Sequence, residues 1–167
     1  TFKPNQRVTE QQFVSILVNF FDLESSPEEM KKYTTKASSS DLNYKALAAH
    51  GVPINGYFDN TIREKTVKRG VVAQAIAYTV DGHQSLNNSI TFLLDHYISS
   101  GQNPAYEHRN LAQFFGATNY LTRAQAVSLF YRLDQGSFYY ISDIALETHE
   151  NGGNLTLVAR ANRAKQS

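Results

Sequence analysis

The chain has 167 residues, of which 41% are hydrophobic, and this suits one domain of ordinary size with a buried core. Its 16 basic and 15 acidic residues leave a net charge of +1, which argues against binding nucleic acid or a membrane surface through bulk positive charge. Cysteine is absent, so disulfides, thiolate zinc sites and cysteine nucleophiles are excluded.

The chain opens Thr-Phe-Lys-Pro-Asn, with neither an initiating Met nor a signal peptide. We therefore expect a processed or excised piece of something longer. No apolar run approaches the roughly 18 residues that a membrane-spanning helix needs.

The first helix is predicted in the stretch RVTEQQFVSILVNFF. Thr9 is expected to be the N-cap, and Gln12 follows three residues later as its capping-box partner. Apolar residues then recur at helical spacing and predict one buried face. This face consists of Phe13, Ile16, Leu17 and Phe20.

Two further helices are predicted between residues 25 and 51. SSPEEMKKYTTK is typical of a short solvated helix with Pro27 in its first turn. SDLNYKALAAHG predicts a helix that Ser40 or Asp41 caps and Gly51 ends, with an apolar side made of Leu42, Leu47 and Ala48. The following stretch, GVPINGYFDNTIRE, is rich in turn residues and predicts a connector.

A second copy of the first helix pattern is predicted in KTVKRGVVAQAIAYTV. Alignment of Val67 with Val8 places a lysine, Lys68, at the cap position, so this copy lacks a hydroxyl cap. Its buried face is predicted to consist of Val72, Ala75, Ile76 and Thr79.

Three helices are predicted in the next part of the chain. SLNNSITFLLDHYISSG ends at Gly101, and PAYEHRNLAQFFG ends at Gly116. YLTRAQAVSLFYRL repeats the first pattern, with Thr122 as the cap and Gln125 as its partner. Its buried face is predicted to consist of Ala126, Leu129, Phe130 and Leu133.

The C-terminal part, residues 134–167, has few helix signals. Asn151-Gly152-Gly153 is a turn signal, and the extended pieces Phe138 to Ile141 and Leu155 to Val158 flank it. We therefore predict a short β-hairpin near the C-terminus, followed by a frayed polar end from Arg160 to Ser167. We expect residues 134–167 to form an extension that packs on the domain or trails from it.

The three similar helix starts are 59 and 54 residues apart, when Val8, Val67 and Leu121 are aligned. A period of about 55 residues indicates three copies of one supersecondary unit. Their approximate ranges are 1–25, 40–82 and 86–133.

The middle copy, GVPINGYFDNTIREKTVKRGVVAQAIAY, resembles the repeat of S-layer homology (SLH) domains. TFKPNQRVTEQQFVSILVNF and YLTRAQAVSLFYRL resemble the second half of such a repeat, so the resemblance covers about residues 1–133. It implies an all-α fold, a helical prism of three repeats with pseudo-three-fold symmetry.

The resemblance also implies a function, which is the non-covalent attachment of a bacterial surface protein to the Gram-positive cell wall. The ligand of such domains is a secondary cell-wall polysaccharide with acidic or pyruvylated sugars, bound in grooves between repeats. By this resemblance we expect an extracellular chain with no cofactor, and the charge balance given above predicts neither nucleic acid nor membrane as a partner. The helix-start arginines and the Gly-rich turn would line the grooves. These residues are Arg69, Arg123, Lys68, Asn55, Gly56, Tyr57 and Asp59.

The chemistry of the helix starts favours the two arginines among these residues. Arginine binds an anion with planar, bidentate donors, and a helix N-terminus adds affinity for anions. Because the helix dipole disfavours a cation at that end, Arg69 and Arg123 break a local rule, which is a hint of function. The first copy has Glu10 at this position, and it would repel an anionic sugar.

Other functions are weaker predictions from this sequence. The main alternative is a protein-interaction or assembly module of a surface protein on the same scaffold; a hydrolase is third, because no catalytic motif is present. The five histidines lack paired metal-ligand spacing, and Asp143, Glu147 and Glu150 are interpreted as a solvated surface, so no metal site is predicted. Tyr57, Tyr106 and Tyr120 are candidate platforms for stacking on sugars.

Overall fold

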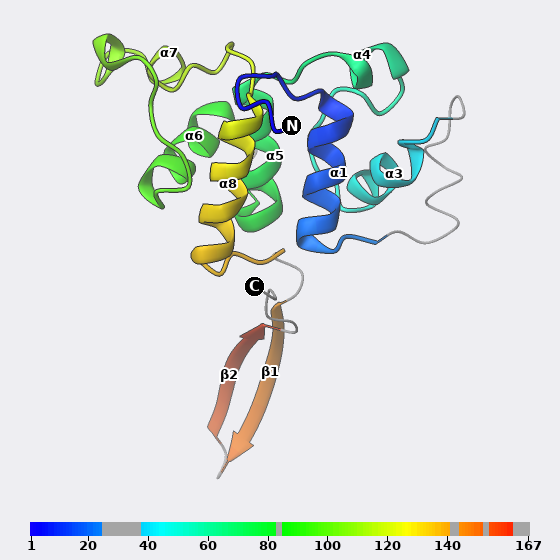
Figure 1. Cartoon of the computed structure of the whole chain (residues 1–167). Coiled ribbons are helices and arrows are strands. Elements are labelled where there is room, and N and C mark those ends of the chain that lie inside the picture. Colours follow the sequence, from blue (N-terminus) through cyan, green and yellow to red (C-terminus); the bar gives the residue numbers. More distant parts are fainter. Residues whose placement is uncertain (25–37, 83–84, 141–143, 152–153, 162–167) are drawn as a thin grey trace.

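The structure is a computed structural model that describes residues 1–24, 38–82, 85–140, 144–151 and 154–161, with side chains as far as residue 140. It is mostly helical, as the sequence predicts (Figure 1). The helices are α1 (Glu10–Phe21), α3 (Asp41–Ala49), α4 (Asn60–Glu64), α5 (Arg69–Asp81), α6 (Leu86–Asp95), the 3-10 helix η1 (Pro104–Tyr106), α7 (Leu111–Phe115) and α8 (Arg123–Gln135). The helix expected at residues 25–36 lies outside the described residues.

The capping boxes predicted for α1 and α8 are confirmed. The backbone N–H of Gln12 donates to Thr9 Oγ1 at 3.3 Å, and Gln12 Oε1 accepts from the Thr9 N–H at 3.0 Å. Thr122 and Gln125 form the same pair at 3.2 and 3.0 Å. Lys68 has no side-chain cap bond, as its lack of a hydroxyl predicts.

The core lies between α1, α5 and α8, which run side by side in Figure 1, and the predicted stripes of α5 and α8 are confirmed as buried. The stripe of α1 is partly wrong, because Ile16 is 39% exposed and Val14, Val18 and Phe21 are buried instead. In α3 the prediction fails at Leu42, which is exposed. In α1 the neighbouring face is covered by α3, which periodicity alone cannot show.

A ring of backbone hydrogen bonds joins the segments that precede α1, α5 and α8. The N–H of Val8 donates to the carbonyl of Leu121, that of Leu121 to Val67, and that of Val67 to Val8, each at 2.9 Å. A second set links the first residue of each helix to the next segment. Its bonds are Glu10 N–H to Lys65 O, Arg69 N–H to Asn119 O and Arg123 N–H to Gln6 O, at 2.8–2.9 Å. The three helices therefore begin at the same end of the bundle.

Smaller elements cover this bundle. α3 and α4 pack against α1, and α6 packs against α5. The connector before α5 contains α4, whose N-cap is Asp59, so its prediction as a turn-rich linker was incomplete. The single helix predicted for PAYEHRNLAQFFG is wrong, because η1 and α7 are separate and Asn110 caps α7.

The C-terminal part contains an antiparallel pair of strands, β1 (Ile144–Asn151) and β2 (Asn154–Ala161), which extends away from the helices in Figure 1. The predicted hairpin is therefore confirmed in kind, and Leu155 to Val158 lies in β2. The first predicted strand is wrong, since residues 138–140 are not extended in a sheet and β1 begins at Ile144. Ile141, Asp143, and Gly152 and Gly153 of the predicted turn lie outside the described residues.

Candidate functional site

The first residues of α1, α5 and α8, Glu10, Arg69 and Arg123, occupy equivalent positions in the two sets of backbone hydrogen bonds. The sequence predicts a ligand-binding role for the two arginines. In the structure the three side chains have very different surroundings. Glu10 and Arg69 are 3% and 5% exposed, whereas Arg123 is exposed.

Glu10 binds the turn that follows α3. Its Oε1 accepts hydrogen bonds from the Tyr44 hydroxyl at 2.6 Å and from the Gly56 N–H at 2.8 Å. Burial raises the pKa of the Glu10 carboxyl, and the hydrogen bonds from Tyr44 and Gly56 oppose this rise. Burial and the bond to Glu10 also raise the pKa of Tyr44. Glu10 is therefore a structural group and does not face a ligand from the surface.

Arg63 holds the same turn from the other side, a role that the sequence analysis missed. Its Nε donates to the Gly56 carbonyl at 2.6 Å and its Nη2 to the Tyr57 carbonyl at 2.8 Å. Nη1 forms a 2.6 Å ion pair with Asp41, and the guanidinium lies 4.0 Å from the Tyr44 ring centroid. The signal in the sequence was the position of Arg63, four residues after Asp59 at the end of the predicted Gly-rich turn. Nothing in the pattern showed that its side chain is buried.

The predicted turn residues are thus divided between structural and accessible positions. Gly56 is buried against Glu10, and Asp59 accepts from the Thr61 N–H at 2.8 Å as the cap of α4. The Tyr57 hydroxyl donates to the Val52 carbonyl. Asn55 and Asp59 are exposed, and Asn55 is open to a ligand without the capping role that Asp59 has.

Arg69 is held by the turn that follows α6 and by the last residue of α7. Its Nε donates to the Phe115 carbonyl at 3.2 Å, and its Nη2 donates to the Ser100 carbonyl at 3.0 Å. The guanidinium lies 4.5 Å from the Phe115 ring centroid, and burial lowers the Arg69 pKa to about 10. The neighbouring Lys68 is exposed. The main role of Arg69 is therefore to hold this part of the chain in place. Arg69 can contact a ligand only from the floor of a groove.

Arg123 has only distant partners among the described side chains. Its Nη1 lies 3.5 Å from Gln6 Oε1, and its guanidinium carbon lies 5.6 Å from the Phe2 ring centroid. The structure therefore does not bring Arg69 and Arg123 into one site. The tyrosines predicted as platforms for sugars also lie in different surroundings. Arg7 lies 4.5 Å from the ring centroid of Tyr120. Tyr106 lies in η1.

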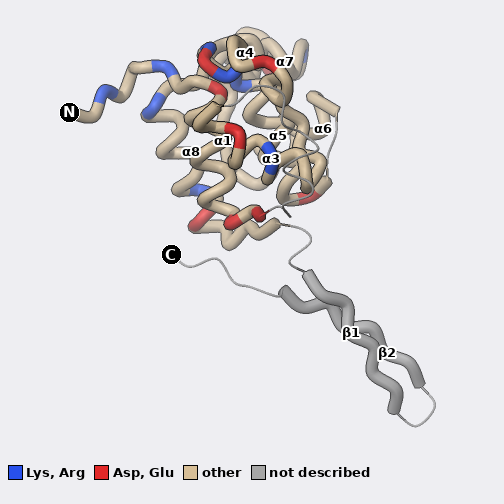
Figure 2. Tube along the Cα trace, turned by 90° about the vertical axis from the view of Figure 1, so that its right-hand side faces the viewer, with Lys and Arg blue, Asp and Glu red and all other residues tan. Residues whose placement is uncertain are grey.

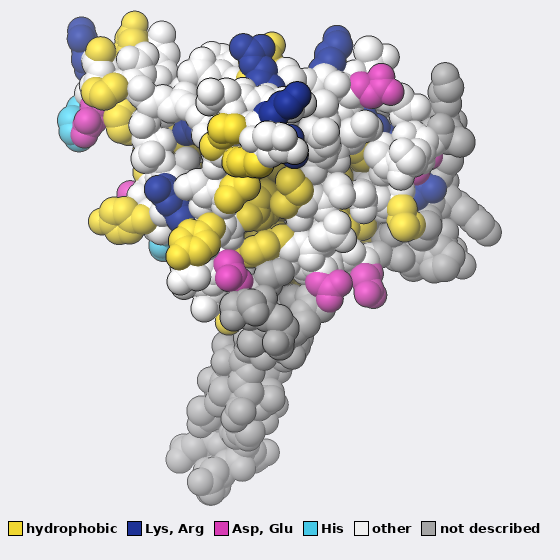
Figure 3. Space-filling view, in the orientation of Figure 1, with side chains coloured by type: hydrophobic (Ala, Val, Ile, Leu, Met, Phe, Trp, Pro, Cys, Tyr) yellow, Lys and Arg dark blue, Asp and Glu magenta, His cyan; other side chains and the backbone are white. Residues whose placement is uncertain are grey.

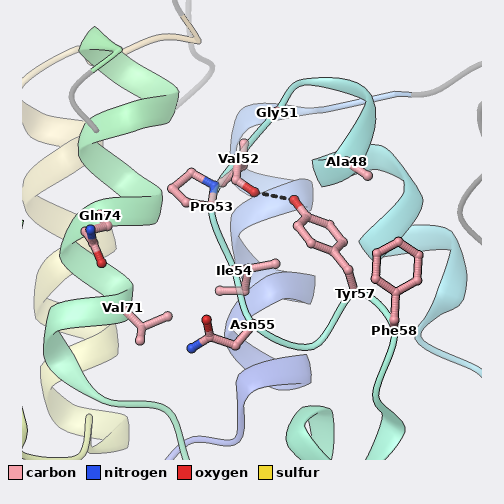
Figure 4. A pocket seen from close by; sticks show the side chains of 10 residues that line it. All are labelled: Ala48, Gly51, Val52, Pro53, Ile54, Asn55, Tyr57, Phe58, Val71 and Gln74. Atoms are coloured by element: carbon pink, nitrogen blue, oxygen red, sulfur yellow. Dashed lines mark hydrogen bonds between the residues drawn. The ribbon is translucent and has the colours of Figure 1, made fainter. Parts of the chain in front are cut away.

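Three grooves follow the three helix starts. The first groove has a volume of about 320 Å³ and lies between α5 and the turn after α3 (Figure 4). Val71 from α5 and Asn55 from the turn point toward each other in this view. It is lined by Ala48, Gly51, Val52, Pro53, Ile54, Asn55, Tyr57, Phe58, Val71 and Gln74. None of these side chains is charged, so the first groove has no cation for an acidic sugar.

The second groove has a volume of about 150 Å³ and lies between α5, α8 and the turn after α6. Its polar side chains are Arg69, Ser99, Ser100, Gln102, Gln125, Ser128 and Arg132, and its lining contains neither Asp nor Glu. Arg132 is exposed, and the sequence analysis missed it. The available signal was its spacing, because Gln125, Ser128 and Arg132 lie three, four and seven residues apart on one face of α8.

The third groove is the largest, with a volume of about 680 Å³, and it lies between α8 and α1. It is lined by Phe2, Gln6, Val8, Gln12, Ser15, Ile16, Arg123, Ala126, Val127 and Phe130. Figure 3 shows apolar side chains gathered over this region of the surface. The third groove is therefore mainly apolar, with Arg123 as the one cation among its lining residues.

The remaining features of the described structure are its charge distribution, its possible metal ligands and its possible membrane spans. Figure 2 shows basic and acidic residues interspersed along the trace. In the described ranges no three His, Asp or Glu side chains gather into a metal-binding group, and no helix has the length and apolar character to cross a membrane. The side chains of Asp143, Glu147 and Glu150 lie outside the described part. Comparison with protein families, curated proteins and solved structures gave no match.

Proposed function

We propose that this domain attaches a surface protein to the bacterial cell wall by binding an acidic secondary cell-wall polysaccharide. The observation that carries the proposal is the lining of the second groove, where Arg69 and Arg132 occur with no acidic residue. Arg132 supplies an exposed guanidinium for a carboxylate, and Arg69 contributes positive charge from the floor. Serine and glutamine side chains of the groove are donors and acceptors for sugar hydroxyl groups.

The three-repeat prism of the SLH type is part of this proposal. It is supported by the equivalence of Glu10, Arg69 and Arg123 in the backbone hydrogen bonds, and by the presence of one groove beside each helix start. In this arrangement the second groove lies between the second and third repeats. The proposed role is binding without a chemical reaction or a cofactor, outside the cell and on the wall.

The test is a pull-down of the purified domain on Gram-positive cell-wall sacculi, before and after extraction of the secondary polysaccharide. Arg132→Ala is expected to weaken binding at least tenfold, because it removes the exposed cation of the second groove. Arg109→Ala is the matched control, since Arg109 is exposed and lines none of the three grooves. Equal binding to extracted sacculi, or equal loss in both variants, would refute the proposal.

The alternative of a protein-interaction module is favoured by a separate observation. Val127 and Tyr131 are 61% and 63% exposed on α8, beside the mainly apolar third groove. Exposed apolar side chains that gather at a groove are typical of a surface that binds another polypeptide. This surface is distinct from the second groove, so the two functions can be tested separately.

A further inference from the structure

α1, α5 and α8 can be compared position by position, because Glu10, Arg69 and Arg123 make equivalent backbone hydrogen bonds. The residues four positions later are Val14, Ala73 and Val127, and those eight positions later are Val18, Ala77 and Tyr131. All six residues have apolar or largely apolar side chains. Since positions i, i+4 and i+8 share one side of a helix, each helix presents a corresponding apolar strip.

The corresponding strips differ in exposure. Val14 and Ala73 are completely buried, whereas Val127 is 61% exposed. α3 packs against α1 and α6 against α5, but no described helix packs as closely against α8. The strip of α8 therefore has the composition of a covered helix face, without a covering helix in the described part of the chain.

The two covering segments share one design. After α3 the chain turns at Gly51, with φ +72°, and Val52 donates its N–H to the carbonyl of Leu47 at 3.1 Å. After α6 it turns at Tyr97, with φ +58°, and the Ile98 N–H bonds in the same way to the carbonyl of Leu93 at 2.9 Å. Val52 and Ile98 are both 1% exposed. Each segment is thus a helix, a left-handed residue and a buried β-branched residue.

The turn of each covering segment is bound by the first side chain of the covered helix. Glu10 accepts from the Gly56 N–H, and Arg69 donates to the Ser100 carbonyl. Arg123 is the equivalent side chain of α8, and it is exposed at the rim of the third groove. A guanidinium at this position can donate hydrogen bonds to the carbonyl groups of such a turn, as Arg69 does to Ser100.

We propose that the α8 strip and the third groove together bind a helix–turn segment of a partner polypeptide. The helix of this segment is amphipathic and covers Val127 and Tyr131 with its apolar face. A left-handed residue and a β-branched residue end the helix, and carbonyl groups of the turn accept hydrogen bonds from Arg123. The inference names the partner class for the alternative function and does not depend on polysaccharide binding.

The probe is a synthetic peptide with the sequence of residues 85–102, which contains α6 and its turn, and a scrambled peptide is its control. Titration of the ¹⁵N-labelled chain is expected to shift the amide signals of Arg123, Val127 and Tyr131 with the helix–turn peptide only. The double variant Val127→Glu/Tyr131→Glu is expected to bind the peptide at least tenfold more weakly. The double variant Asn87→Glu/Thr91→Glu, at two exposed positions of α6, is the charge-matched control and is expected to bind normally.

Three results would overturn the proposal. The first is the absence of signal shifts, or shifts that are equal with the scrambled peptide. The second is unchanged binding by the double variant, whose substitutions are at exposed positions and leave the core intact. The third is a concentration-dependent dimer in sedimentation that the double variant abolishes, because a second copy would then be the occupant. Binding of the double variant to sacculi reports on the second groove independently.

Discussion

The backbone N–H of Gly56 donates a 2.8 Å hydrogen bond to the buried carboxyl group of Glu10, which is 46 residues away in the chain. A Cβ atom at Gly56 would lie 2.4 Å from Glu10 Oε1, 2.8 Å from Arg63 Cγ and 3.0 Å from the Tyr44 hydroxyl oxygen. These three side chains hold one another in place, so none can withdraw without losing a hydrogen bond. The approach of the turn to α1 therefore requires glycine.

Gly56→Ala is expected to lower the free energy of unfolding by roughly 1–3 kcal/mol, because the added methyl group overpacks a closed site. Urea denaturation measures this change. Asn55→Ala is the control, since Asn55 is exposed in the same turn and the substitution leaves the backbone unchanged. An unchanged midpoint for Gly56→Ala would show that the turn is not held against Glu10.

Arg63→Ala is expected to lower the free energy of unfolding by roughly 3–5 kcal/mol, since it removes one member of a buried ion pair. The guanidinium of Arg63 bonds Ser40, Asp41 and the carbonyl groups of Gly56 and Tyr57. Thermal or urea unfolding checks the change. Arg109→Ala removes the same charge at an exposed position and is expected to leave stability unchanged; equal effects of the two substitutions would contradict the structural role of Arg63.

The stability of the fold is expected to depend on pH through Glu10. Burial raises the pKa of Glu10 above its ordinary value of 4.5, so the folded state binds a proton more tightly than the unfolded state. The stabilisation from protonated Glu10 is fully present below pH 4.5 and is lost as the pH rises through the raised pKa. Urea denaturation at a series of pH values from 4.5 upward measures this slope, and Glu10→Gln is expected to flatten it.

Asp41 provides a contrast of opposite sign. Burial acts to raise the pKa of Asp41, but the hydrogen bond and charge of Arg63, with the Ser38 N–H, lower it below 3.8. The contribution of Asp41 is therefore present above pH 3.8 and is lost as the pH falls through the lowered pKa. Asp41→Asn is expected to flatten the dependence at acidic pH while the slope above pH 4.5 persists. Loss of both slopes in one variant would show that the two carboxyl groups titrate as one unit.

Much of the helical framework could be predicted from the sequence, because its signals are local. Thr9 and Thr122 begin helices through bonds to residues three positions away, and Gly51 ends one through its own backbone conformation. The exposure of Leu42 could not be predicted in this way. Its helix has only one covered side, and the side that is covered depends on a packing partner distant in the sequence.

The candidate site was harder to predict for the same reason. The sequence marks Arg69 and Arg123 as unusual cations at helix starts, but it does not show which of them a turn will cover. Arg69 is buried because residues 99–115 reach over it, whereas Arg123 has no such segment among the described residues. Arg132 escaped notice because a charged residue in the last turn of a helix is ordinary in helix chemistry.

The different exposure of equivalent residues in α1 and α8 leads to a direct comparison. Val14→Ala is expected to lower the free energy of unfolding by roughly 1–3 kcal/mol, because it removes two carbon atoms from a closed core and leaves a cavity. Val127→Ala, the same substitution at the equivalent position of α8, is expected to change it by less than about 0.5 kcal/mol. Urea denaturation of both variants measures the difference. If Val127→Ala were as destabilising as Val14→Ala, the α8 strip would already be covered within this chain, and it would not be available to a partner polypeptide.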